Sequence, residues 1–173
     1  YRKYFDGPNS LDYKNNLVVL ELDHLKGKKH LQQVVLLQLI AQLNNEFYLG
    51  DRRVPKILLV DEAWEAFEDP MVAKFLEGAF RRMRKAAAAP VVVTQSLRDL
   101  YNSASGEAIA NNAANVIVLR QNGEAIEALK ESGRFNIGDY GYEMLKSLHT
   151  EPGQYSEVLF RSGTAWGVGR FVV

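Results

Sequence analysis

Residues 56–62 read Lys-Ile-Leu-Leu-Val-Asp-Glu, and this stretch decides the fold. Its four consecutive apolar residues, 57–60, are typical of a strand buried on both faces, as in parallel sheets that helices cover on either side. Two carboxylates, Asp61 and Glu62, follow directly. They come at the carboxyl end of the strand, the edge where open α/β sheets hold their ligands. The stretch therefore predicts a buried parallel strand with two acids at a ligand-binding edge.

Two adjacent acids at the end of such a strand form a Walker B arrangement. Side chains alternate along a strand, so Asp61 and Glu62 can point in different directions. In nucleotide-hydrolysing motors, acids at this edge hold Mg²⁺, usually through water, and orient the water that attacks the terminal phosphate. We expect Asp61 to face the metal and Glu62 to be the catalytic acid. The alternative is a solvated acidic helix start, because Asp and Glu also favour first helical turns.

Composition excludes several classes of protein. The chain has 173 residues, no cysteine, and 21 basic against 21 acidic residues, which gives zero net charge. This length allows one domain with a real core. Without Cys there are no disulfides or thiolate metal sites, and three scattered histidines argue against zinc. Zero net charge gives no overall field to attract nucleic acid or an anionic membrane, so a nucleic-acid partner stays possible but unsupported. Because the chain starts at Tyr1, we expect a piece of a longer protein.

The hydrophobic pattern predicts strands that alternate with helices. Strands are predicted at 17–22, 57–60, 91–93 and 115–119, and helices at 28–47, from Asp69-Pro70 to Met83, and at 97–101, 106–114, 123–131 and 141–148. The helix at 28–47 has apolar residues around more than half of its circumference, so we expect it to be buried on several sides. Residues 1–16 have no period and are expected to be extended, whereas residues 154–173 alternate and predict an antiparallel hairpin. This order predicts a doubly wound α/β domain over 1–173, with a mostly parallel sheet flanked by helices and an antiparallel edge.

Polar residues also end the next predicted strand, at Thr94 and Gln95. Neighbouring parallel strands end at the same edge of a sheet, so the Gln95 amide is expected beside Asp61 and Glu62. An amide there can hold the attacking water or sense the terminal phosphate, and Thr94 is expected to contact the nucleotide. The alternative is a helix start in which Thr94 or Ser96 is the cap and Gln95 is incidental.

Four basic residues compete for the role of an arginine finger, which neutralises charge on the transferring phosphoryl group. Arg84 and Lys85 come just before the strand that leads to Gln95, and one of them is expected to reach a nucleotide, its own or a neighbour's. Arg120, at the end of the fourth strand, and Arg134 are the competitors. The alternative for Arg84 and Lys85 is a solvated face, because any helix C-terminus favours basic residues.

One expected motif does not occur. The sequence contains no Gly-x-x-x-x-Gly-Lys-Ser/Thr, and Gly27-Lys28-Lys29 lacks both the first Gly and the Mg²⁺-binding hydroxyl. A nucleotide's phosphates need a nest of backbone N–H groups and a Lys. A P-loop motor built from this chain would therefore take its Walker A loop and first strand from elsewhere, and these 173 residues alone are expected to be inactive and to bind ATP poorly.

Three longer strings resemble a known family. They are KILLVDEAW at 56–64, RRMRK at 81–85 with VVVTQSLRDLYNSASGEAIANNAANVIVL at 91–119, and GYEMLKSLHTEPGQYSEVLF at 141–160. Together they resemble the C-terminal motor domain of the TraC ATPases of conjugative transfer. Those proteins belong to the VirB-class ATPases of type IV secretion systems, within the RecA-like P-loop NTPases. The similarity runs from about Asp6 to the end and is specific through the stretch from Gln95 to Asn112.

The resemblance implies roles for particular residues. Asp61 and Glu62 take the Walker B positions, Gln95 the glutamine position after the next strand, and Arg84-Lys85 the family's basic motif. Ala86 to Ala89 stands where we expect a more polar loop. The implied fold is a RecA-like fragment whose first strand, the Walker A strand, is missing.

The resemblance also implies a function and a location. The family members are hexameric ATPases at the cytoplasmic face of the bacterial inner membrane. They use ATP and Mg²⁺ to drive pilus assembly and substrate transfer, together with other secretion components. The chain is accordingly expected to be the C-terminal part of such a motor.

Two other functions remain open on the sequence. A DNA-translocating or helicase motor is suggested by Asp61-Glu62-Ala63-Trp64, which is similar to a DEAx-box signature. Against it, helicases of that kind have Ser/Thr-Ala-Thr after the next strand, where this chain has Thr94-Gln95-Ser96. The other alternative is a non-catalytic interaction domain, in which the two acids are structural and the helix at 28–47 contacts a partner.

Overall fold

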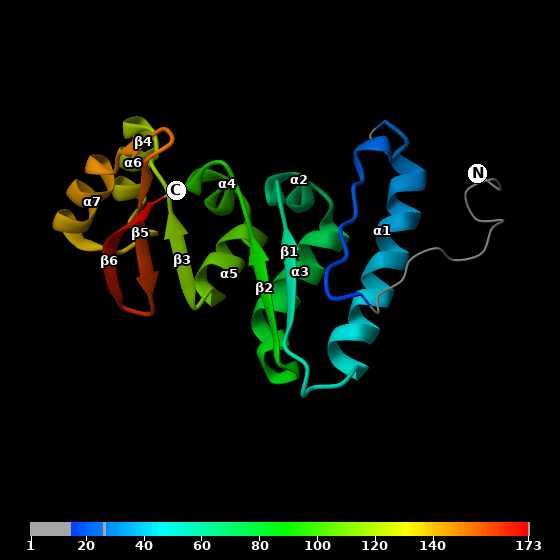
Figure 1. The fold of residues 1–173 in the computed structure, drawn as a ribbon. Helices are drawn as coiled ribbons and strands as arrows, with labels where there is room; N and C mark the ends of the chain where they lie inside the picture. Colours follow the sequence, from blue (N-terminus) through cyan, green and yellow to red (C-terminus); the bar gives the residue numbers. More distant parts are fainter. Residues whose placement is uncertain (1–14, 26, 173) are drawn as a thin grey trace. The chain divides into compact units, whose positions relative to one another are not determined.

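The computed structural model describes residues 15–25 and 27–172, and Figure 1 draws its ribbon. The chain divides into two compact units, Tyr1–Leu49 and Gly50–Val173. The single partial domain predicted over 1–173 stays a prediction. The extended segment predicted at 1–16 lies outside the described residues except for its last two positions. Within the described part of the chain, no helix has the length and apolar character needed to cross a membrane.

The first unit is built around one helix, α1 (Lys29–Asn44), between a short 3₁₀ helix, η2 (Asp23–Leu25), and a short π-helix, η3 (Asn45–Leu49). The helix predicted at 28–47 is confirmed in position. Its expected burial on several sides is wrong, because Val34 is 44% and Leu37 is 56% exposed. Its fully buried residues are Leu31 and Leu39, which belong to one stripe.

The strand predicted at 17–22 is also wrong. Residues 17–22 form no strand, and all but the last of them are exposed. A strand is stabilised by hydrogen bonds to a neighbouring strand, so an apolar run alone does not make one. No described segment pairs with residues 17–22.

The second unit begins with a pair of parallel strands, here called sheet A. Its elements are β1 (Lys56–Val60), α2 (Ala63–Glu68), α3 (Pro70–Arg82), η4 (Met83–Ala86) and β2 (Ala88–Val92). The register runs from Lys56 opposite Ala88 to Val60 opposite Val92. The predicted start of α3 is confirmed, since the Asp69 carboxylate accepts hydrogen bonds from the N–H groups of Met71, at 2.9 Å, and Val72, at 3.2 Å. Such a cap satisfies backbone donors that the helix leaves open.

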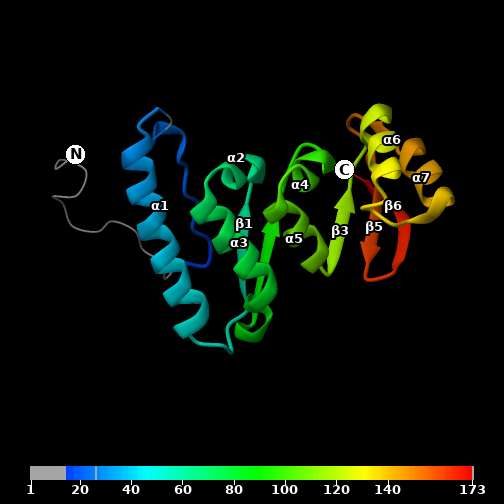
Figure 2. The same ribbon diagram turned by 180° about the vertical axis from the view of Figure 1, so that it is seen from behind.

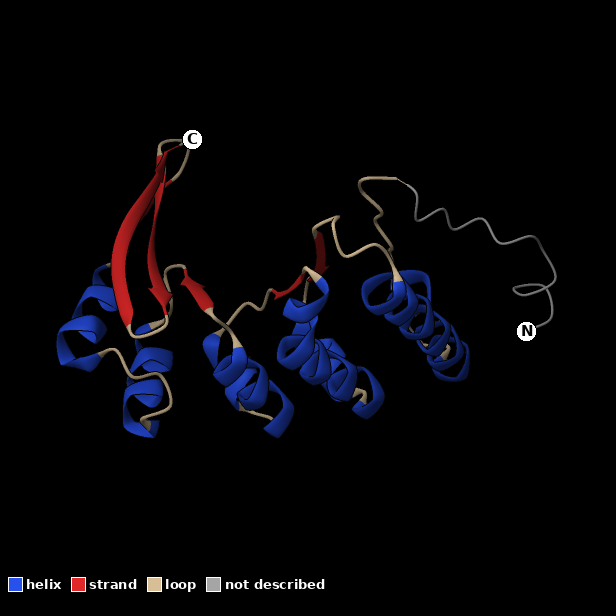
Figure 3. Ribbon diagram, turned by 90° about the horizontal axis from the view of Figure 1, so that it is seen from below, coloured by secondary structure: helices blue, strands red, loops and turns tan. Residues whose placement is uncertain are grey.

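Sheet A is covered on one face, which corrects the prediction that β1 is buried on both. Ile57 is 71% exposed and Leu59 is 60% exposed, whereas Leu58 and Val60 are half-buried. Alternate side chains of a strand point to opposite faces. Within the second unit, Figure 3 shows the helices to one side of the two short strands of sheet A, so only the residues that face this side are covered.

The rest of the second unit surrounds an antiparallel sheet, here called sheet B. Its elements are α4 (Leu97–Tyr101), α5 (Ala104–Asn112), β3 (Asn115–Val118), α6 (Gly123–Ser132), α7 (Gly138–Ser147), β4 (Thr150–Glu151), β5 (Tyr155–Ser162) and β6 (Ala165–Val172). The strand order is β3-β5-β4, with β6 paired to β5. Figures 1 and 2 show α6 and α7 beside β5 and β6.

The predicted α/β class, with helices on a parallel sheet and a C-terminal antiparallel hairpin, is confirmed by this arrangement. One detail differs from the expected single sheet. The fourth predicted strand, β3, pairs antiparallel with β5, from Asn115 opposite Ser162 to Val118 opposite Leu159. The parallel ladder of the described chain therefore consists of β1 and β2.

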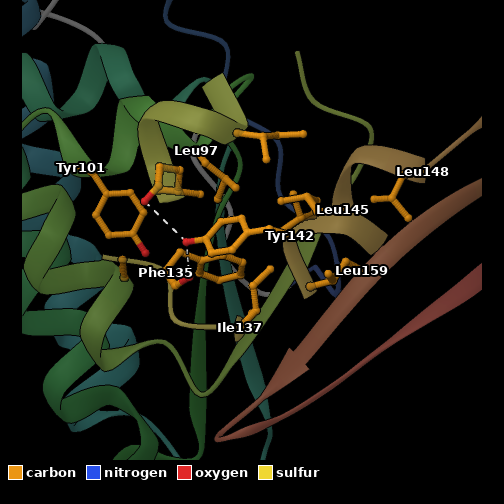
Figure 4. Packing of buried hydrophobic residues seen from close by; sticks show 12 residues of the cluster. Leu97, Tyr101, Phe135, Ile137, Tyr142, Leu145, Leu148 and Leu159 are labelled. Carbon is orange, nitrogen blue, oxygen red and sulfur yellow. Dashed lines mark hydrogen bonds between the residues drawn. The ribbon is translucent and has the colours of Figure 1, made fainter. Parts of the chain in front are cut away.

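The largest buried cluster lies between sheet B and the helices α4, α6 and α7, and Figure 4 shows it from close by. Phe135 and Leu159 are fully buried in it. The Tyr142 hydroxyl donates to the carbonyl oxygen of Phe135 at 2.6 Å and also lies 3.4 Å from that of Leu129. Because Leu97 and Tyr101 belong to the cluster, it anchors helix α4. The cluster thereby supports the segment between β2 and α4, where Gln95 lies.

Candidate active site

The candidate site lies at the carboxyl ends of β1 and β2. The ladder between them extends past the strands, because the Val93 N–H donates to the Val60 oxygen and the Ala63 N–H to the Val93 oxygen, both at 3.0 Å. These two bonds clamp the chain on either side of Asp61 and Glu62. The acids are thus held in the short loop between β1 and α2, and Figure 1 shows this loop near the end of β2.

Glu62 adopts a left-handed backbone conformation, with φ 49° and ψ 42°. For a residue other than glycine this conformation costs about 1–2 kcal/mol. It turns the chain from β1 into α2, whose first bond runs from the Glu65 N–H to the Glu62 oxygen at 3.0 Å. Strained backbone of this kind is concentrated at functional sites.

The predicted meeting of Glu62 and Gln95 is present in the structure. The amide nitrogen of Gln95 donates to the Glu62 carboxylate, 2.9 Å from Oε1 and 3.2 Å from Oε2, across 33 residues of sequence. A third residue, Trp64, joins them, since its indole nitrogen Nε1 lies 2.7 Å from Oε2 of Glu62. The sequence gives little signal for Trp64, because residues two apart on a regular helix do not face each other. The left-handed turn at Glu62 makes this contact possible.

Asp61 is exposed, and its Oδ1 accepts a hydrogen bond from the Glu62 N–H at 2.9 Å. Among the described residues no group of three or more acidic or imidazole side chains is placed to hold a metal ion. Mg²⁺ is commonly bound by one or two carboxylates together with substrate phosphates and water. A single exposed carboxylate therefore fits one partner of a nucleotide-bound Mg²⁺ and does not form a complete metal site.

Gln95 is held in place by the start of helix α4. The Ser96 side chain accepts from the Arg98 N–H at 3.2 Å, and the Asp99 carboxylate accepts from the Ser96 N–H at 3.0 Å, which together form a capping box. The Thr94 hydroxyl donates to the Ser96 oxygen at 3.1 Å. Ser96 is therefore the cap that one alternative suggested, and Gln95 in addition is hydrogen-bonded to Glu62.

The structure does not bring Arg84 and Lys85 to Glu62. Both lie in η4, which precedes β2. Because β1 and β2 are parallel and pair over five residues, η4 is at the opposite end of sheet A from Glu62. Five residues of strand correspond to roughly 16 Å. Within one copy of the chain, these two residues are therefore remote from the candidate site.

The two competing arginines lie in different surroundings. Arg120 is exposed just after β3 and forms no ion pair with any described residue. The next residue, Gln121, accepts a hydrogen bond from the Leu97 N–H at 3.3 Å, so Arg120 lies close to the start of α4, on the same side as Gln95. Arg134 is used structurally, because its Nη1 donates to the Tyr101 oxygen at 2.7 Å.

Comparison with known proteins also indicates a nucleotide-binding type of fold. Residues 5–160 match the TraG P-loop domain. The chain belongs to this family. The protein TraC of Escherichia coli (strain K12) is 29% identical to it over 142 residues, which are 79% of this chain and 16% of TraC. The solved structure of VirB4 of Thermoanaerobacter pseudethanolicus superimposes with a TM-score of 0.68 and 22% identity, over 94% of this chain and 43% of that one.

These matches confirm the resemblance to TraC-type proteins and the fold. The likeness to VirB4 shows a P-loop-type α/β arrangement, with parallel strands flanked by helices and an antiparallel hairpin. The chain spans less than half the length of either relative. The matches indicate an ATPase family in general terms. The carboxyl ends of β1 and β2, here called the rim, hold Glu62 and Gln95 within hydrogen-bond distance of each other.

Proposed function

We propose that this chain is the C-terminal part of the ATPase motor of a type IV secretion or conjugation system. ATP hydrolysis in the full-length protein drives pilus assembly and substrate transfer. The observation that carries this proposal is the contact of the Gln95 amide with the Glu62 carboxylate, at 2.9 Å, where two parallel strands end. The edge at the carboxyl ends of parallel strands is where α/β folds bind nucleotides.

Each polar group of the rim has a chemical role in this proposal. Glu62 takes a proton from the water that attacks the terminal phosphate of ATP, as a general base. Gln95 contacts that water or the phosphate and links it to helix α4. Asp61 faces Mg²⁺ through water, and Thr94 contacts the nucleotide. Mg²⁺ supplies charge stabilisation on the phosphates when it is bound.

Partners and location belong to the same proposal. The full-length protein acts as a hexamer at the cytoplasmic face of the bacterial inner membrane, with other secretion components. Arg84 and Lys85 lie at the opposite end of sheet A from Glu62. In a ring they serve the nucleotide of a neighbouring copy, whereas Arg120, on the same side as Gln95, serves the nucleotide of its own copy.

The test is Glu62→Gln in the full-length protein. The amide keeps the size of the side chain but is not a base as the carboxylate is, so turnover of ATP should fall by about 10²-fold or more. Nucleotide affinity, measured by calorimetry, should be retained. Glu131→Gln is the matched control, because Glu131 is an exposed acid on α6, away from the rim.

Retained turnover in Glu62→Gln would overturn the assignment of the base. A second measurement concerns the 173 residues alone. They contain no Walker A sequence, and they should bind ATP poorly, so a micromolar dissociation constant would show that the phosphates are bound differently from the proposal.

A further inference from the structure

We propose that Trp64 is a positioning residue for Glu62, and that its indole N–H holds the carboxylate in the orientation that hydrolysis requires. This inference rests on the proposed function, because it concerns the same carboxylate. Nε1 of Trp64 lies 2.7 Å from Oε2 of Glu62, while the Gln95 amide nitrogen lies 2.9 Å from Oε1. The Gln95 amide nitrogen also lies 3.2 Å from Oε2, so Trp64 gives Oε2 its shortest contact and Gln95 contacts both oxygens.

The two donors come from different parts of the fold. Trp64 is the second residue of α2, and Gln95 belongs to the segment between β2 and α4. A glutamate side chain turns about three single bonds, so one contact leaves it several orientations. Two contacts from separate elements restrict it to one. A group that is oriented before the reaction needs no reorganisation during it, which is a large part of enzymatic rate enhancement.

Trp64 lies near α4, the helix that follows Gln95. Trp64 lines a shallow hollow, and the other lining residues are Phe67, Glu68, Asp99, Asn102 and Ser103. Asp99 is also the residue that completes the capping box before α4. Both donors to Glu62 therefore lie near α4, which the buried cluster anchors.

An indole is suited to this role by its chemistry. Its N–H is a donor and has no lone pair available to accept a proton. Trp64 can therefore orient the carboxylate without competing for the proton that Glu62 receives. Trp64→Phe keeps an aromatic ring and removes the donor, whereas Trp64→His keeps an N–H donor in a smaller ring.

The contact can be tested without nucleotide, in the 173-residue chain labelled with ¹⁵N-tryptophan. The chain has two tryptophans, Trp64 and Trp166, so Trp166→Phe leaves one indole N–H resonance to observe. In this background, Glu62→Ala should move the indole proton resonance upfield and speed its exchange with water. An indole resonance that is the same with and without Glu62 would overturn the inference.

The kinetic test uses the full-length protein. Trp64→Phe should lower the turnover number about ten- to a hundredfold, with KM and nucleotide affinity unchanged, and Trp64→His should recover part of the loss. The matched control, Trp166→Phe, should keep full turnover. Normal turnover in Trp64→Phe, or loss of turnover together with nucleotide binding, would overturn the inference. These results leave the proposed function standing, since its own tests are the turnover of Glu62→Gln and the affinity of the 173 residues for ATP.

Discussion

Sheet A and sheet B bury their apolar residues in different ways. Sheet B and its helices enclose a cluster in which Phe135 and Leu159 are fully buried. Sheet A leaves Ile57 71% and Leu59 60% exposed on its open face. Its other face is covered, with Leu76 and Met83 almost fully buried, and polar contacts and backbone bonds hold the residues at its rim. The difference teaches that burial stabilises both regions, whereas at the rim of sheet A hydrogen bonds fix the positions of exposed polar side chains.

The largest effect that tests this contrast is expected at the centre of the sheet B cluster. Phe135→Ala removes a fully buried ring and should lower the free energy of unfolding by about 3–5 kcal/mol. The measurement is urea denaturation of the chain, followed by the fluorescence of Trp166, which packs against the cluster. Phe160→Ala is the control, because Phe160 is 43% exposed and should cost clearly less. Equal losses would show that the cluster does not dominate stability.

A smaller effect is expected from the Tyr142 hydroxyl, which joins this cluster to the backbone. Tyr142→Phe leaves the Phe135 carbonyl without its 2.6 Å partner and should cost about 1–2 kcal/mol. Tyr140→Phe changes the same atom at a position that is 73% exposed and should be near neutral. A neutral result for Tyr142→Phe would mean that the region relies on apolar contacts alone.

The pH dependence of stability should also report on the sheet B cluster, because Tyr101 and Tyr142 belong to it. Burial raises the pKa of Tyr142 and of Tyr101 above their ordinary value of 10.0. Below pH 10 both tyrosines are protonated in the folded and the unfolded chain, so this contribution to stability is fully present. As the pH rises beyond 10, the unfolded chain loses these protons first and stability falls. Denaturation midpoints at pH 9, 10 and 11 should therefore fall, and Tyr142→Phe should flatten the decline relative to Tyr140→Phe.

The smallest effect is expected on the open face of sheet A. Leu59→Ser should change the free energy of unfolding by no more than about 0.5 kcal/mol, because most of the side chain is already in water. Leu58→Ser, one residue away on the helix-covered face, should cost more. The same denaturation experiment, followed by Trp64 fluorescence in Trp166→Phe, measures both. A large loss for Leu59→Ser would show that the face is covered in solution.

Local signals predicted much of this fold from the sequence. The start of α3 was predictable from Asp69-Pro70, because capping depends on residues within one turn. The C-terminal hairpin was predictable from the alternation at 154–173, and the antiparallel pairing of β5 with β6, which ends with Ser162 opposite Ala165, confirms it. The contact of Glu62 with Gln95 followed from a general property of parallel strands, whose ends meet at one edge.

Features that depend on distant surroundings were not predictable in the same way. An apolar run at 17–22 has the composition of a strand, but pairing requires a partner that no described segment provides. The run at 57–60 does not reveal whether helices cover one face or two. β3 pairs with β5 although the paired residues Val118 and Leu159 are more than 40 residues apart in sequence, so local patterns do not reveal this partner. Trp64 was missed because its contact depends on the backbone angle of Glu62.

That backbone angle has a consequence for how this protein would respond to selection for stability. Asn adopts the left-handed region far more readily than Glu does. Glu62→Asn should therefore relieve conformational cost and raise the melting temperature, while shortening the side chain beyond reach of Gln95. A screen for thermostable variants would then favour loss of this acid, and activity would have to be selected alongside heat resistance to keep it.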